Sequence, residues 1–422
     1  MVYVVGGTVR DILLKRKVTD VDVAMVVNPF DVARHFAYMI EGSFVPLHDV
    51  LPTARVVKRV GGQYYNFDFT TLRADTIEDD LKGRDFTINA MAIPLLDKGA
   101  QVFDIMGSRK DLRAGIIRVV DEKNLLDDPL RLLRAFRFSA RLRFNIENGT
   151  LQAIKTFKSH IQSVSAERVF YELKEMFNEP TVYGAFKEMA ESGLFLELFP
   201  QLKNTITNKD MVNLLLAFAA LEDLLKAPEK TFSFYEKIVK YLSYEKYTVG
   251  LIKLAFLLFY KSPQDIDSFL EGLQNSLKTS KKEQLFFRLI CLNKQEFPRL
   301  IENVEDKVEL VKFLEKTGDA IYAIIVIVVA EMTTSGQLRG GIARDIAINI
   351  ASWIDFYENT YKPLTTKESL ITGADLINVF ALEPSILFGK ILNHIRQKTL
   401  AGILTSKKQA LREVEIFINE NQ

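Results

Sequence analysis

The sequence predicts an α+β fold, in which strands and helices mix over residues 1–118 and helices alone follow. Four short stretches are rich in β-branched residues or alternate between apolar and polar residues, at 2–5, 20–27, 54–60 and 64–71. From about residue 121 the apolar residues recur at helical spacing instead. A chain of 422 residues is too long for one ordinary core, so we expect several domains.

The composition is typical of a globular protein, with 48% hydrophobic and 26% charged residues. The longest apolar run, residues 320–330, is too short to span a bilayer and predicts a buried helix, so we expect no membrane association. Cys291 is the only cysteine, which excludes a disulfide scaffold and favours a reducing cytoplasm. Because the net charge is only +1, a nucleic-acid partner would need a local basic patch.

The first predicted strand ends at two glycines, Gly6 and Gly7, and Thr8 can cap the helix that follows. A strand, a glycine turn and a helix N-terminus bring free backbone N–H groups together at one place. That arrangement suits a phosphate group. The alternative is a simple turn without a ligand.

Acidic residues alternate with apolar ones along two of the predicted strands. Asp20 and Asp22 share one face of the strand at 20–27, because side chains alternate along a strand. Asp68 lies on the polar face of the strand at 64–71 and can join them if the two strands are neighbours. Paired carboxylates near a phosphate-binding turn predict a site for a divalent metal and a nucleoside triphosphate. A solvated strand face is the alternative.

Two later segments carry polar residues that suit a nucleotide. Arg84 and Asp85 precede an apolar stretch that we expect to start a helix, with Asn89 one turn further on. A charged pair beside an amide can hold a ribose by its hydroxyls, and an ordinary helix cap is the alternative. Asp127-Asp128-Pro129 then predicts a helix start with Asp128 as N-cap.

The helix after Pro129 carries a row of arginines at spacings of three and four. They are Arg131, Arg134, Arg137 and Arg141, opposite an apolar stripe of Leu132, Phe136 and Ala140. Arginines without interleaved glutamates suit a polyphosphate or an RNA backbone, and a solvated arginine face is the alternative. Near the C-terminus, residues 361–364 look like a linker, and six basic residues follow: Lys390, Arg396, Lys398, Lys407, Lys408 and Arg412.

Four motifs together give the chain a resemblance to a known family. They are GGTVRD at 6–11 with DVD at 20–22, RDFTINAMA at 84–92, DDPLRLLR at 127–134 with Arg137-Phe138, and TGADL at 372–376 with residues 395–396 and 400–402. In this order they resemble the class II tRNA nucleotidyltransferases, the CCA-adding enzymes, and their bacterial poly(A) polymerase relatives. The first three motifs are highly specific, and the four span nearly the whole chain.

The resemblance implies a polymerase-β-type nucleotidyltransferase head at 1–118, a helical neck at 119–185, a body at 186–310 and a tail at 311–422. It implies transfer of CMP and AMP from CTP and ATP to the 3′ end of tRNA, without a nucleic-acid template. The partners would be CTP, ATP and tRNA, held at its 3′ end and its acceptor/TψC region. Whether the protein forms a homodimer is left open by the resemblance.

The same resemblance assigns roles to residues. Asp20 and Asp22 would bind Mg²⁺ in a two-metal site, with Asp68 a further catalytic candidate. The other assigned residues would bind the nucleotide: Gly6, Gly7 and Arg10 beside the triphosphate, Arg84, Asp85 and Asn89 at the ribose, Asp128 and Arg131 at the base, and Arg134 and Arg137 towards the phosphates. A carboxylate and an arginine side by side match the donor and acceptor pattern that C and A share.

Three departures from the family pattern bear on the activity. Asp127 stands where the family usually has Glu, and Gly83 where it usually has a first arginine. The link between Arg73 and Arg84 is also short, whereas relatives that add the final A usually carry a longer flexible loop there. The leading hypothesis is CCA addition, and the short link makes a CC-adding enzyme the first alternative.

Two further alternatives are weaker. A poly(A) polymerase would be more basic and would continue differently after Ala90, where this chain has Met91-Ala92. A non-catalytic tRNA-binding module would not need the intact acidic and arginine motifs of the head and neck.

Overall fold

The computed structural model describes residues 1–48, 52–95, 99, 101–203, 205–261, 263–302, 306–336 and 341–420. The chain divides into two compact units, residues 1–203 with 276–278, and residues 204–275 with 279–422. The predicted division into head, neck, body and tail stays a prediction. No helix in the described ranges is both long and apolar enough to cross a membrane.

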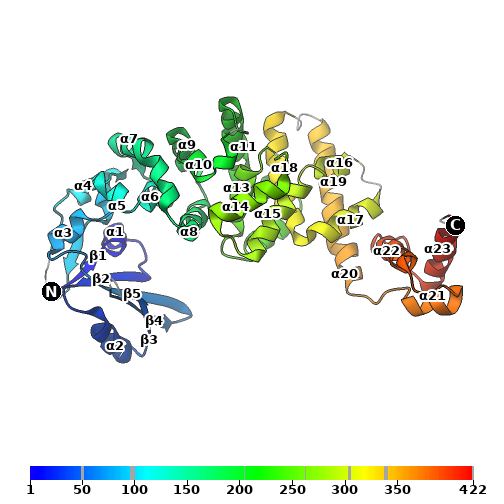
Figure 1. Cartoon of the computed structure of the whole chain (residues 1–422), viewed down its shortest axis with the longest axis horizontal. Helices are drawn as coiled ribbons and strands as arrows, with labels where there is room; N and C mark the ends of the chain where they lie inside the picture. The colour runs from blue at the N-terminus through cyan, green and yellow to red at the C-terminus, as the bar shows by residue number, and fades with distance from the viewer. Residues whose placement is uncertain are drawn as a thin grey trace. The chain divides into compact units, whose positions relative to one another are not determined.

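The first unit contains a six-stranded sheet and the helices around it (Figure 1). Its elements are β1 Val2–Val5, α1 Gly7–Leu13, β2 Asp20–Met25, α2 Pro29–Met39, β3 Ser43–His48, β4 Thr53–Val60, β5 Gln63–Thr71, α3 Ile77–Lys82, the 3₁₀ turn η1 Thr87–Asn89, β6 Ala92–Pro94, α4 Ser108–Ala114, β7 Ile116–Ile117, α5 Lys123–Asp127, α6 Leu130–Leu142, β8 Asn145–Ile146, α7 Asn148–Phe157, η2 Lys158–Ser163, α8 Ala166–Phe177, α9 Tyr183–Ser192, α10 Leu194–Leu198 and η3 Pro200–Leu202.

The strand order of the sheet is β3-β4-β5-β2-β1-β6. Strand β2 runs parallel to β5 and antiparallel to β1, so the sheet is mixed and the predicted α+β class is confirmed. Helix α2 packs against β4 and β5, where Phe69 and Val56 join the apolar residues of one core. Tyr3, Val5 and Leu81 belong to a second core. The apolar positions of the strands are thus buried, and the polar positions of β2 and β5 can face a ligand.

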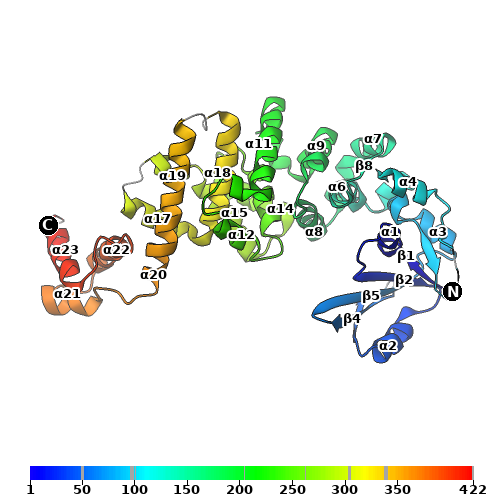
Figure 2. The same ribbon diagram turned by 180° about the vertical axis from the view of Figure 1, so that it is seen from behind.

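The second unit is helical in its described residues, and Figure 2 shows its helices from behind. They are α11 Asn208–Lys226, η4 Pro228–Lys230, α12 Tyr235–Leu242, α13 Thr248–Leu258, α14 Ile266–Leu277, α15 Lys281–Asn293, α16 Phe297–Glu302, α17 Lys307–Thr317, η5 Gly318–Ala320, α18 Ile321–Ser335, α19 Gly341–Phe356, the π-helical turn η6 Tyr357–Tyr361, α20 Lys362–Thr365, α21 Gly373–Phe380, α22 Ile386–Leu400 and α23 Lys407–Glu420. Helix α18 is buried along most of its length beside α11, so the predicted buried helix at 320–330 is confirmed.

Three local predictions are wrong. The stretch after Asp85 forms only the short turn η1, because Ala92–Pro94 then pairs with β1 as a sheet strand. The expected linker at 361–364 is helical, and the Tyr361 ring stacks on Tyr357 with ring centroids 5.7 Å apart. Helix α6 begins at Leu130, so Pro129 occupies the N-cap position that was predicted for Asp128, and no side chain bonds the cap.

Candidate active site

The glycine turn brings an arginine and an aspartate from other segments close to the backbone. Gly6 has a φ of +67°, a conformation that favours glycine. A Cβ atom built on Gly6 would lie 2.8 Å from Nη1 of Arg84 and 3.5 Å from Oδ2 of Asp22. Backbone, guanidinium and carboxylate therefore meet at one point, and only glycine leaves room for them.

Thr8 fixes the strand that carries the two aspartates. Its buried hydroxyl donates to the Asp20 carbonyl (3.2 Å) and accepts from the backbone N–H of Asp22 (2.8 Å). The expectation that Thr8 caps helix α1 is therefore wrong: Gly6 occupies the N-cap position, and no side chain bonds the cap. The hydroxyl holds α1 and β2 together, which sets the position of the aspartates relative to the turn.

The three predicted acidic residues lie on neighbouring strands. In the parallel register of β2 and β5, Asp22 is opposite Asp68 and Asp20 is opposite Asn66. Asn66 donates to Asp20 Oδ1 at 2.8 Å. Asp68 accepts two hydrogen bonds from Arg55, at 2.7 and 2.8 Å. The predicted grouping of the acidic residues is thus present, although Asp68 is bound to an arginine that the sequence analysis missed.

The surroundings of Asp22 disfavour the ionised form of its carboxyl group. Burial, the neighbouring Asp68 and Asp20 raise its pKa from 3.8 to about 6, while Arg84 and Arg10 act in the opposite direction. A carboxyl group in this environment favours either a proton or a cation. Within the described part of the chain, no group of three or more acidic, His or Cys side chains has the geometry of a metal site.

Arg84 is held over the glycine turn by a buried carboxylate. Asp80 Oδ2 accepts from Nε and Nη2 of Arg84, at 3.0 and 2.8 Å. Its other oxygen accepts from the backbone N–H of Arg73 at 3.0 Å, so the Asp80 side chain connects the two ends of the segment between β5 and Arg84. Since Asp80 is only 2% exposed, it fixes the direction of the Arg84 guanidinium.

Asp85 and Asn89 form a buried network with Arg10. Asp85 Oδ1 accepts from the Asn89 amide (3.1 Å) and from the backbone N–H of Phe86 (2.8 Å). The Asn89 oxygen accepts from Arg10 Nη1 at 2.7 Å. Arg10 also donates twice to Asp11, at 2.9 Å each. The structure brings these three predicted nucleotide-binding residues together, and their contacts with a nucleotide stay a prediction.

The arginines of α6 bind carboxylates from two other segments. Arg134 donates to Asp85 Oδ2 from Nε and Nη2, at 3.0 and 2.7 Å. Glu172 of α8 accepts from Arg134 at 3.4 Å and also from Arg137. Although burial acts to raise it, the Arg134 charge holds the pKa of Asp85 well below its usual range. The guanidinium groups of Arg134 and Arg137 also lie over the Phe138 ring, at 5.2 and 4.2 Å.

The side chains of Asp128 and Arg131, the predicted base-reading pair, each bond to a different part of the protein. Arg131 donates to the backbone carbonyls of Asn124 and Gly83, at 3.0 and 2.9 Å. Asp128 lies in extended backbone between α5 and α6 and accepts from Arg168 at 3.0 and 3.1 Å. Arg131 thereby connects α6 to the segment that precedes Arg84.

Sequence reasoning missed several residues that position this site. They are Arg55, Asp80, Asn124, Arg168 and Glu172. The Asn124 amide, for example, donates to the carbonyls of Lys82 and Arg84, at 2.7 and 2.8 Å. Asp80 could have been found, because it stands four residues before Arg84, at the spacing of a helical ion pair. The partners of the others are distant in sequence, and no local pattern indicates them.

Comparisons with known proteins indicate the family of this chain. Residues 2–118 match the family model of the poly A polymerase head domain, and residues 143–206 match that of the probable RNA and SrmB-binding site of polymerase A. A CC-adding tRNA nucleotidyltransferase of Synechocystis is 28% identical over 96% of this chain and 91% of its own. A CCA-adding enzyme of Lactobacillus helveticus is 30% identical over 66% of this chain and 73% of its own.

The fold agrees as well. The structure of a Thermotoga maritima CCA-adding enzyme, solved in complex with tRNA, superposes with a TM-score of 0.69 at 24% identity, over 99% of this chain and 91% of that one. The head fold and the family matches define an enzyme of the nucleotidyltransferase class. The chain belongs to the family of tRNA nucleotidyltransferases that includes the CCA-adding and CC-adding enzymes.

The raised pKa of Asp22 predicts how stability depends on pH in metal-free protein. Between pH 4 and 6 the folded state keeps a proton that the unfolded state has released, so stability falls as pH rises. We expect Asp22→Asn to remove this fall and to raise the free energy of unfolding at pH 7 by about 3 kcal/mol. Urea denaturation in EDTA measures it, with the exposed Asp31→Asn as control. If the stability of Asp22→Asn fell with pH as steeply as that of the wild type, the expectation would be contradicted.

Proposed function

We propose that this enzyme extends the 3′ end of tRNA without a template, taking CMP from CTP and AMP from ATP. The observation that carries the proposal is the meeting of the Gly6 backbone, Asp22 and Arg84 just after the last residue of β1. A triphosphate needs a close backbone approach, a cation and a carboxylate-bound metal, and these three groups can supply them. The names of the relatives supply the tRNA substrate.

The residues present fit a divalent cation such as Mg²⁺. Asp20 and Asp22 would hold it, because burial and the neighbouring carboxylates of Asp68 and Asp20 raise the pKa of Asp22, and a cation here would stabilise its ionised form. When bound, a pair of such ions would activate the 3′-hydroxyl and steady the leaving pyrophosphate. Thr8 orients the backbone of both aspartates, and Asp80 holds the Arg84 guanidinium towards the same point.

Asp128 and Arg131 remain our candidates for selecting C and A. A carboxylate has about four acceptor positions, so Asp128 can accept from a base amine while it holds Arg168. Arg131 uses two of its N–H groups on backbone carbonyls, and a guanidinium has about five. Its attachment to the Gly83 carbonyl would fix the base reader relative to Arg84, so that base and triphosphate are bound in one geometry.

A second candidate, addition of CC without the final A, is favoured by one observation. The connection ahead of Arg84, where A-adding relatives usually carry a flexible loop, contains the short helix α3. Thr76 caps α3 by accepting from the backbone N–H of Asp79, and Asp80 ties Arg73 to Arg84. A segment fixed in this way has little freedom to rearrange between the C and A steps, so on this point the structure favours the CC-adding candidate.

Removal of the two strand carboxylates tests the proposed function. We expect Asp20→Ala with Asp22→Ala to reduce incorporation of labelled CMP into tRNA that lacks its CCA end by at least about a hundredfold, because metal binding supplies several kcal/mol of transition-state stabilisation. The exposed Asp31→Ala is the matched control. Retained incorporation in the double variant would rule out the proposed function.

The two candidates differ in their use of ATP. Because α3 fixes the connection ahead of Arg84, the CC-adding candidate predicts that AMP incorporation into tRNA ending in CC is at least about tenfold slower than CMP incorporation into tRNA ending in C, a difference of about 1.4 kcal/mol in barrier, whereas full CCA addition predicts similar rates. Single-turnover assays of both steps measure this ratio. Equal rates would eliminate the CC-adding candidate and establish addition of the full CCA sequence.

A further inference from the structure

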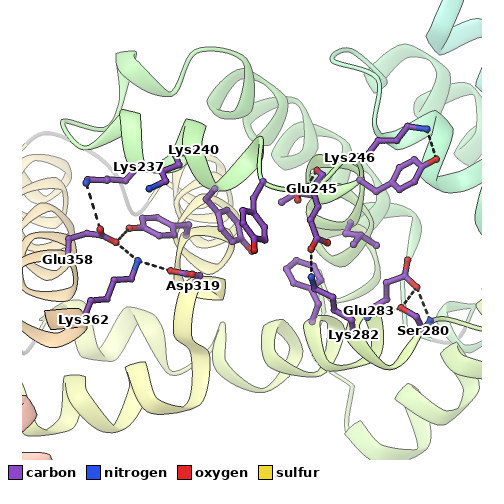
Figure 3. Close-up of a pocket in the computed structure, with 17 residues that line it drawn as sticks. Lys237, Lys240, Glu245, Lys246, Ser280, Lys282, Glu283, Asp319, Glu358 and Lys362 are labelled. Carbon is purple, nitrogen blue, oxygen red and sulfur yellow. Dashed lines mark hydrogen bonds and ion pairs between the residues drawn. The ribbon is translucent and has the colours of Figure 1, made fainter. Parts of the chain in front are cut away.

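The second unit contains a cavity of about 660 Å³ that shares no residue with the site around Gly6 (Figure 3). It is lined by helices α12, α13, α15 and α18 and by the η6–α20 segment. Five aromatic side chains and five lysines contribute to its wall. Its volume falls within the range of about 300–1,000 Å³ that small-molecule sites occupy.

One face of α12 gives the cavity its character. Lys237, Lys240 and Tyr241 stand at positions i, i+3 and i+4 of this helix, the spacing that places side chains on one side, and Tyr244 also lines the cavity. Two lysines are followed here by two tyrosines, so cationic and aromatic side chains lie side by side on the cavity wall. Tyr244 follows the last residue of α12 and is 80% exposed, so packing does not explain its ring.

The charged groups gather at two ends of the cavity, with aromatic rings between them (Figure 3). At one end Glu358 accepts from Lys362 (2.6 Å) and lies 3.7 Å from Lys237, and Asp319 lies 2.9 Å from Lys362. Among the described residues, no carboxylate lies within ion-pair distance of Lys240. A cationic group therefore remains for an anionic ligand at this end.

At the other end Lys282 pairs with Glu245. Over the whole wall, five lysines face four carboxylates, which leaves the cavity with a small positive excess. The lysines that are already paired contribute to the positive electrostatic potential of the cavity, but they offer no vacant N–H donor to a ligand. Lys240 is thus the cation best placed to hold a phosphate.

The aromatic part of the wall offers a stacking surface and an unused hydroxyl. The rings of Tyr241 and Tyr322 lie 5.5 Å apart at 36°. Tyr322 donates to Glu358 at 2.6 Å, whereas the Tyr241 hydroxyl has no hydrogen-bond partner in the part of the chain that the structure describes. Burial, with Asp319 and Glu245, raises the pKa of Tyr241, so its hydroxyl stays protonated and available as a donor.

We propose that this cavity is a nucleotide-binding site separate from the catalytic centre, in which Tyr241 and Tyr244 stack on a base and Lys240 holds its phosphate. Basic groups combined with aromatic rings on one surface are the means by which proteins hold nucleotides without reading their sequence. The nucleotide can be free, or it can be an unpaired nucleotide within an RNA chain. The proposal stands independently of the function proposed for the head.

Binding measurements on the full-length chain test this site. In EDTA, equilibrium dialysis with labelled CMP reports the free nucleotide, and filter binding with an oligocytidylate about eight nucleotides long reports the RNA-linked one. We expect Tyr244→Ala and Lys240→Ala each to weaken binding of at least one probe by about fivefold or more. Both residues are exposed, so the variants should fold.

Matched controls are Tyr235→Ala and Lys230→Ala, which do not line the cavity and should leave binding unchanged. A loss with CMP identifies a free nucleotide as ligand, and a loss only with the oligomer identifies an RNA-linked one. Unchanged binding of both probes by both cavity variants would overturn the proposal. CMP incorporation at saturating tRNA should be unaffected, so a failed catalytic assay and a failed binding assay are distinguishable.

Discussion

The ion pair between Asp85 and Arg134 is the interaction on which the candidate active site depends. Asp85 is 7% exposed, and its carboxylate accepts two hydrogen bonds from the guanidinium of Arg134. A buried carboxylate without such a partner would cost several kcal/mol of folding free energy. The segment that contains Asp85 is therefore stable only when it packs against helix α6. From Asp85 the network continues through Asn89 to Arg10 in helix α1. The glycine turn and the arginine helix are thereby parts of one polar core.

This core explains why an arginine-rich helix is not a solvated face. Arg131 and Arg137 are each 8% exposed, and both are bound to protein oxygens. Phe138 places its ring beneath the guanidinium groups of Arg134 and Arg137, which adds a cation–π contribution to each. In the folded protein each buried guanidinium has few other rotamers open to it. Little further side-chain entropy is therefore lost when a ligand binds. The result is a preorganised set of cations, which is consistent with the nucleotide-binding role proposed for these arginines.

Much of the fold and part of the site could be predicted, because they depend on local spacing. Alternation along β2 and β5 was enough to place Asp22 and Asp68 on one face, and the structure pairs them in register. Local spacing could not show that Asp68 is bound to Arg55, or that Thr8 bonds the strand instead of the helix cap. Those contacts depend on which strands are neighbours. The short link before Arg84 was visible as a length, but its ordered helix required the structure.

A double-mutant cycle on Asp85→Asn and Arg134→Gln, read as free energies of unfolding, tests the central claim most directly. If the pair holds the turn and α6 together, each single change should cost about 3–5 kcal/mol by leaving the other charge buried and unpaired. The double variant should cost little more than either, which gives a coupling energy above about 2 kcal/mol. Costs that simply add would contradict the account, because Asp85 and Arg134 would then contribute independently.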